Sequence, residues 1–239
     1  MATSRKKPIK NEPILHREFM MRDDFHEQVA AMAPPRLVPL NAVELSDSIN
    51  HTLAAKPKPS DGIWVFAYGS LLWDCPVKTD SLIPATAVGW HRTWSLEDTV
   101  IRGTIEWPSL TMGLEPGDQC QGVALHLNES TLALELKILW RREMLFGAYS
   151  PQWIEVKDML GRPLDPCIAF TQNTASPRYL GSLPYENVVR RLASASGPFG
   201  SSIEYLSLVQ TSLSKVGLID TKVDQLLEDA SVLVLDVKK

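Results

Sequence analysis

A short polar segment interrupts an apolar run near residue 64. The sequence "WVFAYGSLLW" is typical of a buried strand as far as Ala67, and then gives Tyr68, Gly69 and Ser70 before apolar residues resume. A strand that ends in such a turn leaves backbone N–H groups free to bind an anion or a developing oxyanion. Gly69 lets a ligand approach the backbone closely, and the Ser70 hydroxyl adds a donor. The alternative is a buried turn whose polar groups are satisfied internally.

The second candidate for chemistry is Glu143, in "NESTLALELKILWRREMLFGAY". Cap-forming residues from Asn128 and a stop at Gly147 predict a helix over about 129–146. On a helical wheel with Leu132 at zero, Glu143 falls at about 20°, among the apolar side chains. The two arginines before it fall at about 180° and −80°, so neither is expected to neutralise it on that helix.

A carboxylate on an apolar face is poorly solvated. Desolvation disfavours its charged form, raises its pKa and makes it a better general base. The alternative is that the helix frays near its C-terminus and Glu143 reaches solvent. The helical wheel alone does not distinguish a buried Glu143 from a solvated one.

Other polar residues have simpler explanations. Ser201 and Glu204 fit a capping box at the start of a helix, and "ASASGPFG" is either a tight connection or a backbone surface for a ligand. The five histidines and three cysteines show no metal-binding spacing. Phosphate-binding and dinucleotide-binding glycine motifs are also missing, so we expect no metal and no cofactor.

Composition limits the class of protein. The chain has 239 residues, of which 44% are hydrophobic and 22% charged, enough for one substantial core. Its net charge of −4 does not favour nucleic acid or an anionic membrane as a partner. The apolar runs are too short to span a bilayer, and the widely spaced cysteines indicate a reducing, cytoplasmic location. Oligomeric state is not readable from the sequence.

The chain divides near residue 60. Residues 1–60 form a charge-rich extension with a proline-rich linker, and 61–239 form the main domain. Within the extension, Phe19, Met20, Phe25, Val29 and Met32 have rough helical spacing, which predicts a short helix that docks on the main domain.

The main domain mixes strands and helices without strict alternation. Strands are expected in "GIWVFAY", "TAVGWHRTWSL", "QCQGVALHLN", "QWIEVKDMLGRPL" and "PCIAFTQN". Helices are expected over about 129–146, 184–195 and 202–216, with a last one after Asp220. This order indicates an α+β domain rather than a doubly wound parallel sheet.

The motifs together resemble a known family. "VFAYGSLLW", "RGT", "LWRREM", "GAYSPQW", "SPRYLG" and "ASGPFGSSIEYL" occur in the order and approximate spacing of the ChaC-type glutathione-specific gamma-glutamylcyclotransferases, over about residues 62–228. The resemblance implies a small mixed β-barrel flanked by helices. It also implies cleavage of glutathione to 5-oxoproline and cysteinylglycine without a cofactor.

The resemblance also implies roles for individual residues. Glu143 matches the proton acceptor, and the segment around Tyr-Gly-Ser matches the part that binds the gamma-glutamyl group. Further candidates for orienting the substrate are two tyrosines and an arginine. The expected substrate-binding residues are Val65, Phe66, Ala67, Tyr68, Gly69, Ser70, Leu71, Arg102, Tyr149 and Tyr179.

Three positions depart from the family pattern: Ala67 stands where Gly is common, Ile101 where His is common, and Ser202 where Asn is usual. The last two bear on the cysteinylglycine end of the substrate. Two alternatives therefore stay open. One is a cyclotransferase for other gamma-glutamyl amines or peptides, and the other is a binding or regulatory protein on the same fold.

Overall fold

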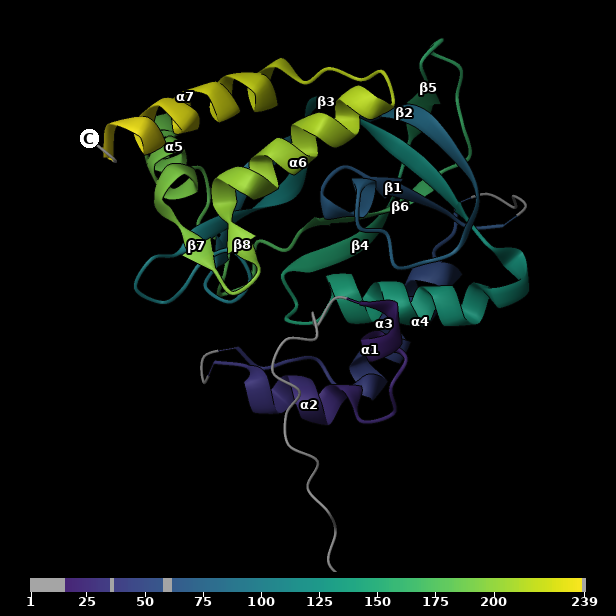
Figure 1. The fold of residues 1–239 in the computed structure, drawn as a ribbon. Helices are drawn as coiled ribbons and strands as arrows, with labels where there is room; N and C mark the ends of the chain where they lie inside the picture. The colour runs from purple at the N-terminus through teal and green to yellow at the C-terminus, as the bar shows by residue number, and fades with distance from the viewer. Residues whose placement is uncertain (1–15, 35–36, 58–61, 238–239) are drawn as a thin grey trace, which may run out of the picture.

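A curled six-stranded sheet forms the centre of the protein (Figure 1). The computed structural model describes residues 16–34, 37–57 and 62–237. The strands lie in the order β4-β6-β1-β3-β2-β5; β1 and β6 run parallel and the other neighbours antiparallel. Their bounds are β1 Trp64–Ala67, β2 Thr79–Asp98, β3 Ser109–Leu127, β4 Tyr149–Ile154, β5 Val156–Asp158 and β6 Cys167–Gln172.

The two edges of this sheet are joined by one residue. Strand β4 pairs with β6 at one edge, and β5 pairs with β2 at the other, yet only Glu155 separates β4 from β5 in the chain. The Glu155 carbonyl also accepts a hydrogen bond from Val88 N in β2 at 3.2 Å. The edges must therefore lie side by side, so the sheet curls back on itself as a small mixed barrel. The predicted α+β class and architecture are confirmed.

The β2–β3 hairpin is longer than the sequence pattern predicts. Both strands continue past the proline-containing segments at Pro84 and Pro116, where the pattern alone would end them. Pro116 pairs with Trp90 beside a register shift, and such irregularities accommodate a residue that cannot donate to the ladder. The hairpin's closing loop, residues 99–108, reaches the pocket described below.

Helices cover the sheet on two sides (Figure 1). On one side α5, α6 and α7 pack against Phe66 and the inner residues of β3, and on the other α4 packs against Val65 and Ala67. Strand alternation therefore sends neighbouring β1 side chains to opposite faces. The helix bounds are α4 Leu132–Glu143, α5 Tyr185–Ser194, α6 Ser202–Lys215 and α7 Thr221–Val237, with short 3-10 turns η1 Ser70–Leu72 and η2 Glu129–Thr131 and the small ribbon β7 Ser196–Gly197 and β8 Gly200–Ser201.

The N-terminal segment docks on the free side of α4. It forms α1 Arg17–Met20, α2 Phe25–Met32 and α3 Ala42–Ala54, where the sequence predicted a single short helix. Phe19, Met20, Phe25 and Val29 are buried in the same apolar cluster as α4, so the predicted docking is confirmed. Residues 1–15, and the linker at 58–61, lie outside the described residues.

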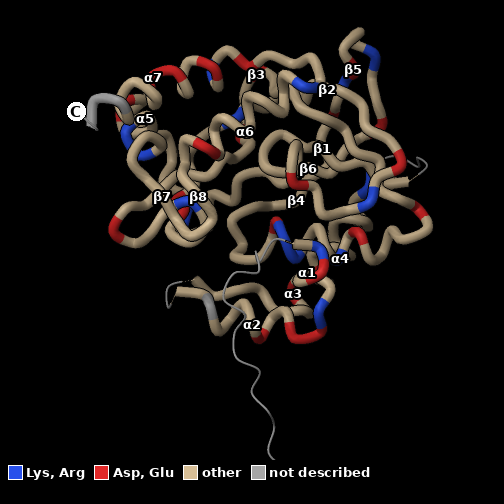
Figure 2. The backbone as a smooth tube through the Cα atoms, in the orientation of Figure 1, with Lys and Arg blue, Asp and Glu red and all other residues tan. Residues whose placement is uncertain are grey.

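The charge pattern is mixed. Basic and acidic residues are interspersed along the backbone (Figure 2). None of the helices in the described part of the chain has both the length and the apolar character that a bilayer crossing needs.

Candidate active site

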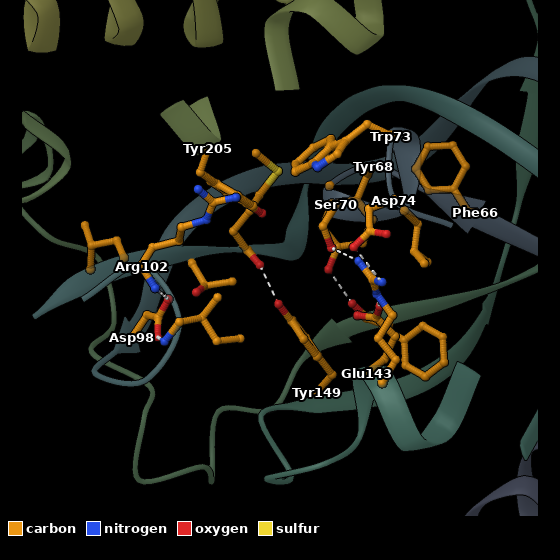
Figure 3. A pocket seen from close by; sticks show the side chains of 18 residues that line it. Phe66, Tyr68, Ser70, Trp73, Asp74, Asp98, Arg102, Glu143, Tyr149 and Tyr205 are labelled. Carbon is orange, nitrogen blue, oxygen red and sulfur yellow. Dashed lines mark hydrogen bonds and ion pairs between the residues drawn. The ribbon is translucent and has the colours of Figure 1, made fainter. Parts of the chain in front are cut away.

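One pocket brings most of the predicted site residues together (Figure 3). It encloses about 110 Å³ where the end of β1, the last turn of α4, the β2–β3 loop and the start of α6 meet. Of the predicted residues, those that line it are Phe66, Tyr68, Gly69, Ser70, Leu71, Arg102, Glu143 and Tyr149.

The turn after β1 has unused backbone donors. Pairing of β1 with β3 ends at Ala67, and within the described structure the N–H groups of Tyr68, Gly69 and Ser70 donate to no protein acceptor. A Cβ placed on Gly69 would lie 3.5 Å from the Tyr205 hydroxyl, inside the pocket lining. The turn that lines the pocket therefore carries backbone donors without a protein acceptor in the described structure.

Buried contacts fix this turn in place. The Tyr68 hydroxyl donates to the Phe170 carbonyl on the neighbouring strand β6 at 2.5 Å. The Tyr68 carbonyl accepts from Arg92 Nε at 2.9 Å, and Arg92 also forms an ion pair with Asp220 at 2.5 Å. The donors at Gly69 and Ser70 are therefore preorganised before any ligand binds.

Glu143 is the last residue of α4 and turns into the pocket. Its side chain keeps 13% exposure, so the alternative of a frayed, solvated carboxylate does not hold. Burial raises the pKa of Glu143; Arg142 acts against this shift, and Asp74 adds to it. The result is a carboxylate with raised basicity and restricted access to water.

Arg142 is the nearest counter-charge, contrary to the helical-wheel prediction. Its Nε donates to Glu143 Oε1 at 3.1 Å. The wheel gives only the directions in which side chains leave the helix, whereas the long arginine side chain at the last turn folds back over its neighbour. The prediction that Arg142 would not neutralise Glu143 is therefore wrong.

Arg142 also joins Glu143 to the turn. Its Nη2 donates to Ser70 Oγ at 3.2 Å and its Nη1 to Asp74 at 3.0 Å, while only 3% of the side chain is exposed. Because Ser70 Oγ accepts from Arg142, its own proton is free to point at a ligand. This role of Arg142 was not predicted, and its signal in the sequence is the adjacency of the two residues in "WRRE".

Aromatic residues and Met112 form another part of the pocket wall. Tyr149 donates its hydroxyl to the Met112 carbonyl at 2.8 Å, and Tyr205 packs edge-on against Trp73. Burial, with the Glu143 charge contributing, raises the pKa values of Tyr149 and Tyr205. These phenols therefore stay protonated and can act only as neutral hydrogen-bonding groups.

The far end of the pocket is built by the β2–β3 loop. Buried Asp98 accepts the backbone N–H groups of Val100, Ile101 and Arg102 at 2.8–3.0 Å and so fixes the loop. Arg102 forms an ion pair with Glu204 at 2.9 Å. Figure 3 shows Glu143, Ser70 and Asp74 at one end of the pocket and Arg102 with Asp98 at the other.

Three predicted residues do not line the pocket. The side chains of Val65 and Ala67 lie in the α4 cluster, because alternation along β1 turns them away from the interior. Tyr179 bridges to Leu96 on β2 and hydrogen-bonds to Glu115. These three side chains could contact a substrate in the pocket only if the chain around them were arranged differently.

The remaining sequence candidates have structural roles. Ser201 caps α6 by accepting from Glu204 N at 3.2 Å, but the Glu204 carboxylate pairs with Arg102, so only half of the capping box forms. In "ASASGPFG", a Cβ on Gly197 would lie 2.5 Å from the Ile101 carbonyl, so this segment is a tight connection. Ser202 is fully buried against Ser109.

Comparisons with known proteins identify the class. The fold is similar to that in the crystal structure of the glutathione-specific gamma-glutamyl cyclotransferase from yeast. The TM-score is 0.65 over 72% of this chain and 96% of that one, and the two sequences are 20% identical. The fold is thus that of the gamma-glutamylcyclotransferases. The chain is also 32% identical to the glutathione-specific gamma-glutamylcyclotransferase of Escherichia coli over 93% of this chain and 95% of that protein. Gamma-glutamylcyclotransferase 2-3 of Arabidopsis thaliana is 28% identical over 69% of this chain and 86% of its own.

The family assignment rests on a direct match. The family model described as ChaC-like protein matches residues 63–236. The chain therefore belongs to the ChaC-like protein family. The resemblance inferred from the ordered motifs is confirmed.

Proposed function

We propose that the protein is a glutathione-specific gamma-glutamylcyclotransferase that releases 5-oxoproline and cysteinylglycine. The observation that carries the proposal is the pocket itself, where a buried carboxylate, Glu143, faces a turn with free backbone donors at Tyr68 to Ser70. Relatives whose names state this activity support the choice of glutathione.

The first step uses a nucleophile that the substrate carries. Glu143 accepts a proton from the α-ammonium of the gamma-glutamyl group, and the freed amine attacks the γ-carbonyl to close a five-membered ring. Its raised pKa suits the task, because an ordinary carboxylate is too weak a base to hold the ammonium's proton. The wall of the pocket would hold the flexible chain in the folded geometry that attack needs.

The second step expels the cysteine nitrogen. Attack places negative charge on the γ-carbonyl oxygen, and the N–H groups at Gly69 and Ser70, which have no protein acceptor in the described structure, are suited to bind it. The C–N bond to cysteine then breaks as the cysteine nitrogen takes the first proton from Glu143. Glu143 next accepts the second proton, which the ring nitrogen loses as the lactam forms, and passes it to the released amine, which leaves as an ammonium. Atoms and charge balance without a cofactor or an enzyme nucleophile.

The cysteinylglycine end would lie toward Ile101 and Arg102. Arg102 is the cation at that end of the pocket, which suits a terminal carboxylate. In the structure it is already paired with Glu204, so a substrate carboxylate must share or displace that partner. This pairing favours a second candidate function, a cyclotransferase for gamma-glutamyl amines that have no such carboxylate.

A product assay tests the proposal. Purified protein incubated with glutathione is expected to release 5-oxoproline and cysteinylglycine in equal amounts. N-acetyl-glutathione, whose amine is blocked, is the matched control and should give neither. A faster reaction with a gamma-glutamyl alkylamine, which has no carboxylate at its far end, than with glutathione would favour the second candidate, and no product from any gamma-glutamyl compound would contradict both.

We also infer a cytoplasmic location. All three cysteines lie in the described part of the chain and none forms a disulfide. Glutathione is abundant in reducing compartments, where free thiols persist. Fractionation of cells that express the tagged full chain tests this inference.

A further inference from the structure

The last turn of α4 carries two arginines that point in opposite directions. Arg142 faces the pocket, whereas Arg141 points into the N-terminal segment, residues 16–57. Only 5% of Arg141 is exposed. Its Nη1 donates to the backbone carbonyls of Met20 and of Arg22, the latter at 3.0 Å. Its guanidinium carbon lies 4.8 Å from the centre of the Phe25 ring.

The N-terminal segment also holds the chain on the other side of Glu143. Leu40 N donates to the Leu145 carbonyl at 2.9 Å. Residues 141 and 145 are each two positions from Glu143, so the segment contacts the chain just before and just after it. The end of a helix lacks intrahelical partners for its carbonyls and tends to fray, and these contacts oppose that tendency.

Burying a charged guanidinium costs free energy, because the charge loses its hydration. Burial lowers the pKa of Arg141 and the charge of Asp23 opposes that shift, while its hydrogen bonds go to the backbone carbonyls of Met20 and Arg22. A buried charge adds little to stability alone, whereas a planar guanidinium whose Nη1 binds two carbonyls fixes geometry. The arrangement is therefore better suited to orientation than to packing.

We propose that Arg141 is a positioning residue, through which the N-terminal segment holds the last turn of α4 so that Glu143 and Arg142 stay directed into the pocket. The inference rests on the proposed function of Glu143. It extends the catalytic unit beyond the family match, which begins at residue 63.

The same interface supplies a matched control. At the other end of α4, fully buried Glu135 pairs with both terminal nitrogens of Arg17, at 2.5 and 2.8 Å. Glu135 lies eight residues before Glu143, which is about 12 Å along the helix. Replacing Arg17 by Met removes that ion pair but none of the atoms that Arg141 contacts, and Glu135 still accepts from Lys78 N and Thr131 Oγ1.

The kinetic test compares Arg141→Met, Arg141→Lys and Arg17→Met with the wild type, using glutathione. For Arg141→Met we expect kcat to fall about 10- to 100-fold with a smaller change in KM, because the base is misplaced rather than the substrate lost. The acidic limb of its kcat profile should move to lower pH, since water that enters a loosened turn lowers the pKa of Glu143 toward its ordinary value. Arg141→Lys keeps the charge and should recover part of kcat. Arg17→Met should leave both kcat and the pH of the acidic limb at their wild-type values.

Hydrogen exchange gives a readout that does not depend on turnover. The amides of Met144 and Gly147, which bond to the Trp140 and Met144 carbonyls, should exchange faster in Arg141→Met than in Arg17→Met. If the wild type has no activity, the proposed function fails while the exchange data still decide whether Arg141 holds this turn. The inference is overturned if Arg141→Met and Arg17→Met show the same amide exchange rates at Met144 and Gly147. It is also overturned if the two variants have the same kcat and the same acidic limb in the kcat profile. If Arg141→Met does not fold, Arg141→Lys carries the same comparison.

Discussion

Arg142→Met is the perturbation whose consequences the structure specifies most fully. It removes the donors to Glu143, Ser70 and Asp74, at 3.1, 3.2 and 3.0 Å. Hydrogen bonds to charged groups contribute about 1.5–3 kcal/mol each, and the bond to half-exposed Asp74 counts least. We therefore expect the free energy of unfolding to fall by about 2–3 kcal/mol, measured by urea denaturation.

The same change should alter the pH dependence of catalysis. Burial raises the pKa of Glu143 and Arg142 lowers it, so removing Arg142 raises it further. The base must be ionised to accept a proton, and kcat therefore rises as pH rises through this pKa. The acidic limb of the kcat profile should move to higher pH, the opposite of the shift expected for Arg141→Met.

The Arg142→Met change should also lower the turnover rate, and Arg142→Lys serves as its control. Loss of the link between Glu143 and the Ser70 turn should lower kcat about 100-fold at neutral pH, as misplacement of a reacting group does. Arg142→Lys keeps a cation at the site and should shift the limb less. A folded Arg142→Met protein whose acidic limb is unmoved, or moves to lower pH, would refute the reasoning.

Three further predictions concern other parts of the site. Glu143→Gln should raise the Tm by about 2–4 °C at neutral pH. Because the folded-state pKa of Glu143 is raised, its contribution to stability is full below its unfolded pKa and is lost as pH rises through the folded value, so the gain should vanish in acid. Gly69→Ala places a Cβ in ordinary contact with Tyr205 but inside the pocket, so kcat/KM should fall about 10-fold at unchanged Tm; equal kcat/KM would contradict the placement of this turn. Arg92→Met leaves Asp220 without its partner and should cost about 3 kcal/mol in urea denaturation; a loss below half of that would show that the pair does little to fix Tyr68.

Much of the fold could be predicted because the local patterns are strong. The apolar run before Tyr68 and the cap-rich start near Asn128 place β1 and α4 close to their observed positions. Barrel closure could not be predicted from these patterns. It depends on the pairing of β4 and β5 with different partners on either side of Glu155, a tertiary choice that no short window contains.

The candidate site was predictable where one residue stands out locally. Glu143 breaks an apolar helical face, and that conflict is visible without a structure. Arg142 was missed because its effect depends on how a long side chain folds at a helix end. Val65 and Ala67 were predicted to bind substrate because they belong to the motif, but strand alternation turns their side chains away from the pocket.

The N-terminal segment shows a different limit. Its apolar spacing predicted docking, but α3 was not expected, although Leu45, Ile49 and Leu53 recur every four residues. A capping box at Asn41 and the bond from Trp140 Nε1 to Ser48 Oγ at 3.0 Å support this helix. The four-residue spacing and the capping box are therefore local signals from which this helix could have been predicted.

The most direct test of the account is 5-oxoproline release from glutathione by the wild type and by Glu143→Gln, with glutathione binding to both measured by calorimetry. The account predicts release by the wild type, and a fall in kcat of about 100- to 10,000-fold in a folded variant that still binds glutathione. A Glu143→Gln protein that turns over glutathione at the wild-type rate would contradict the assignment of Glu143 as the base.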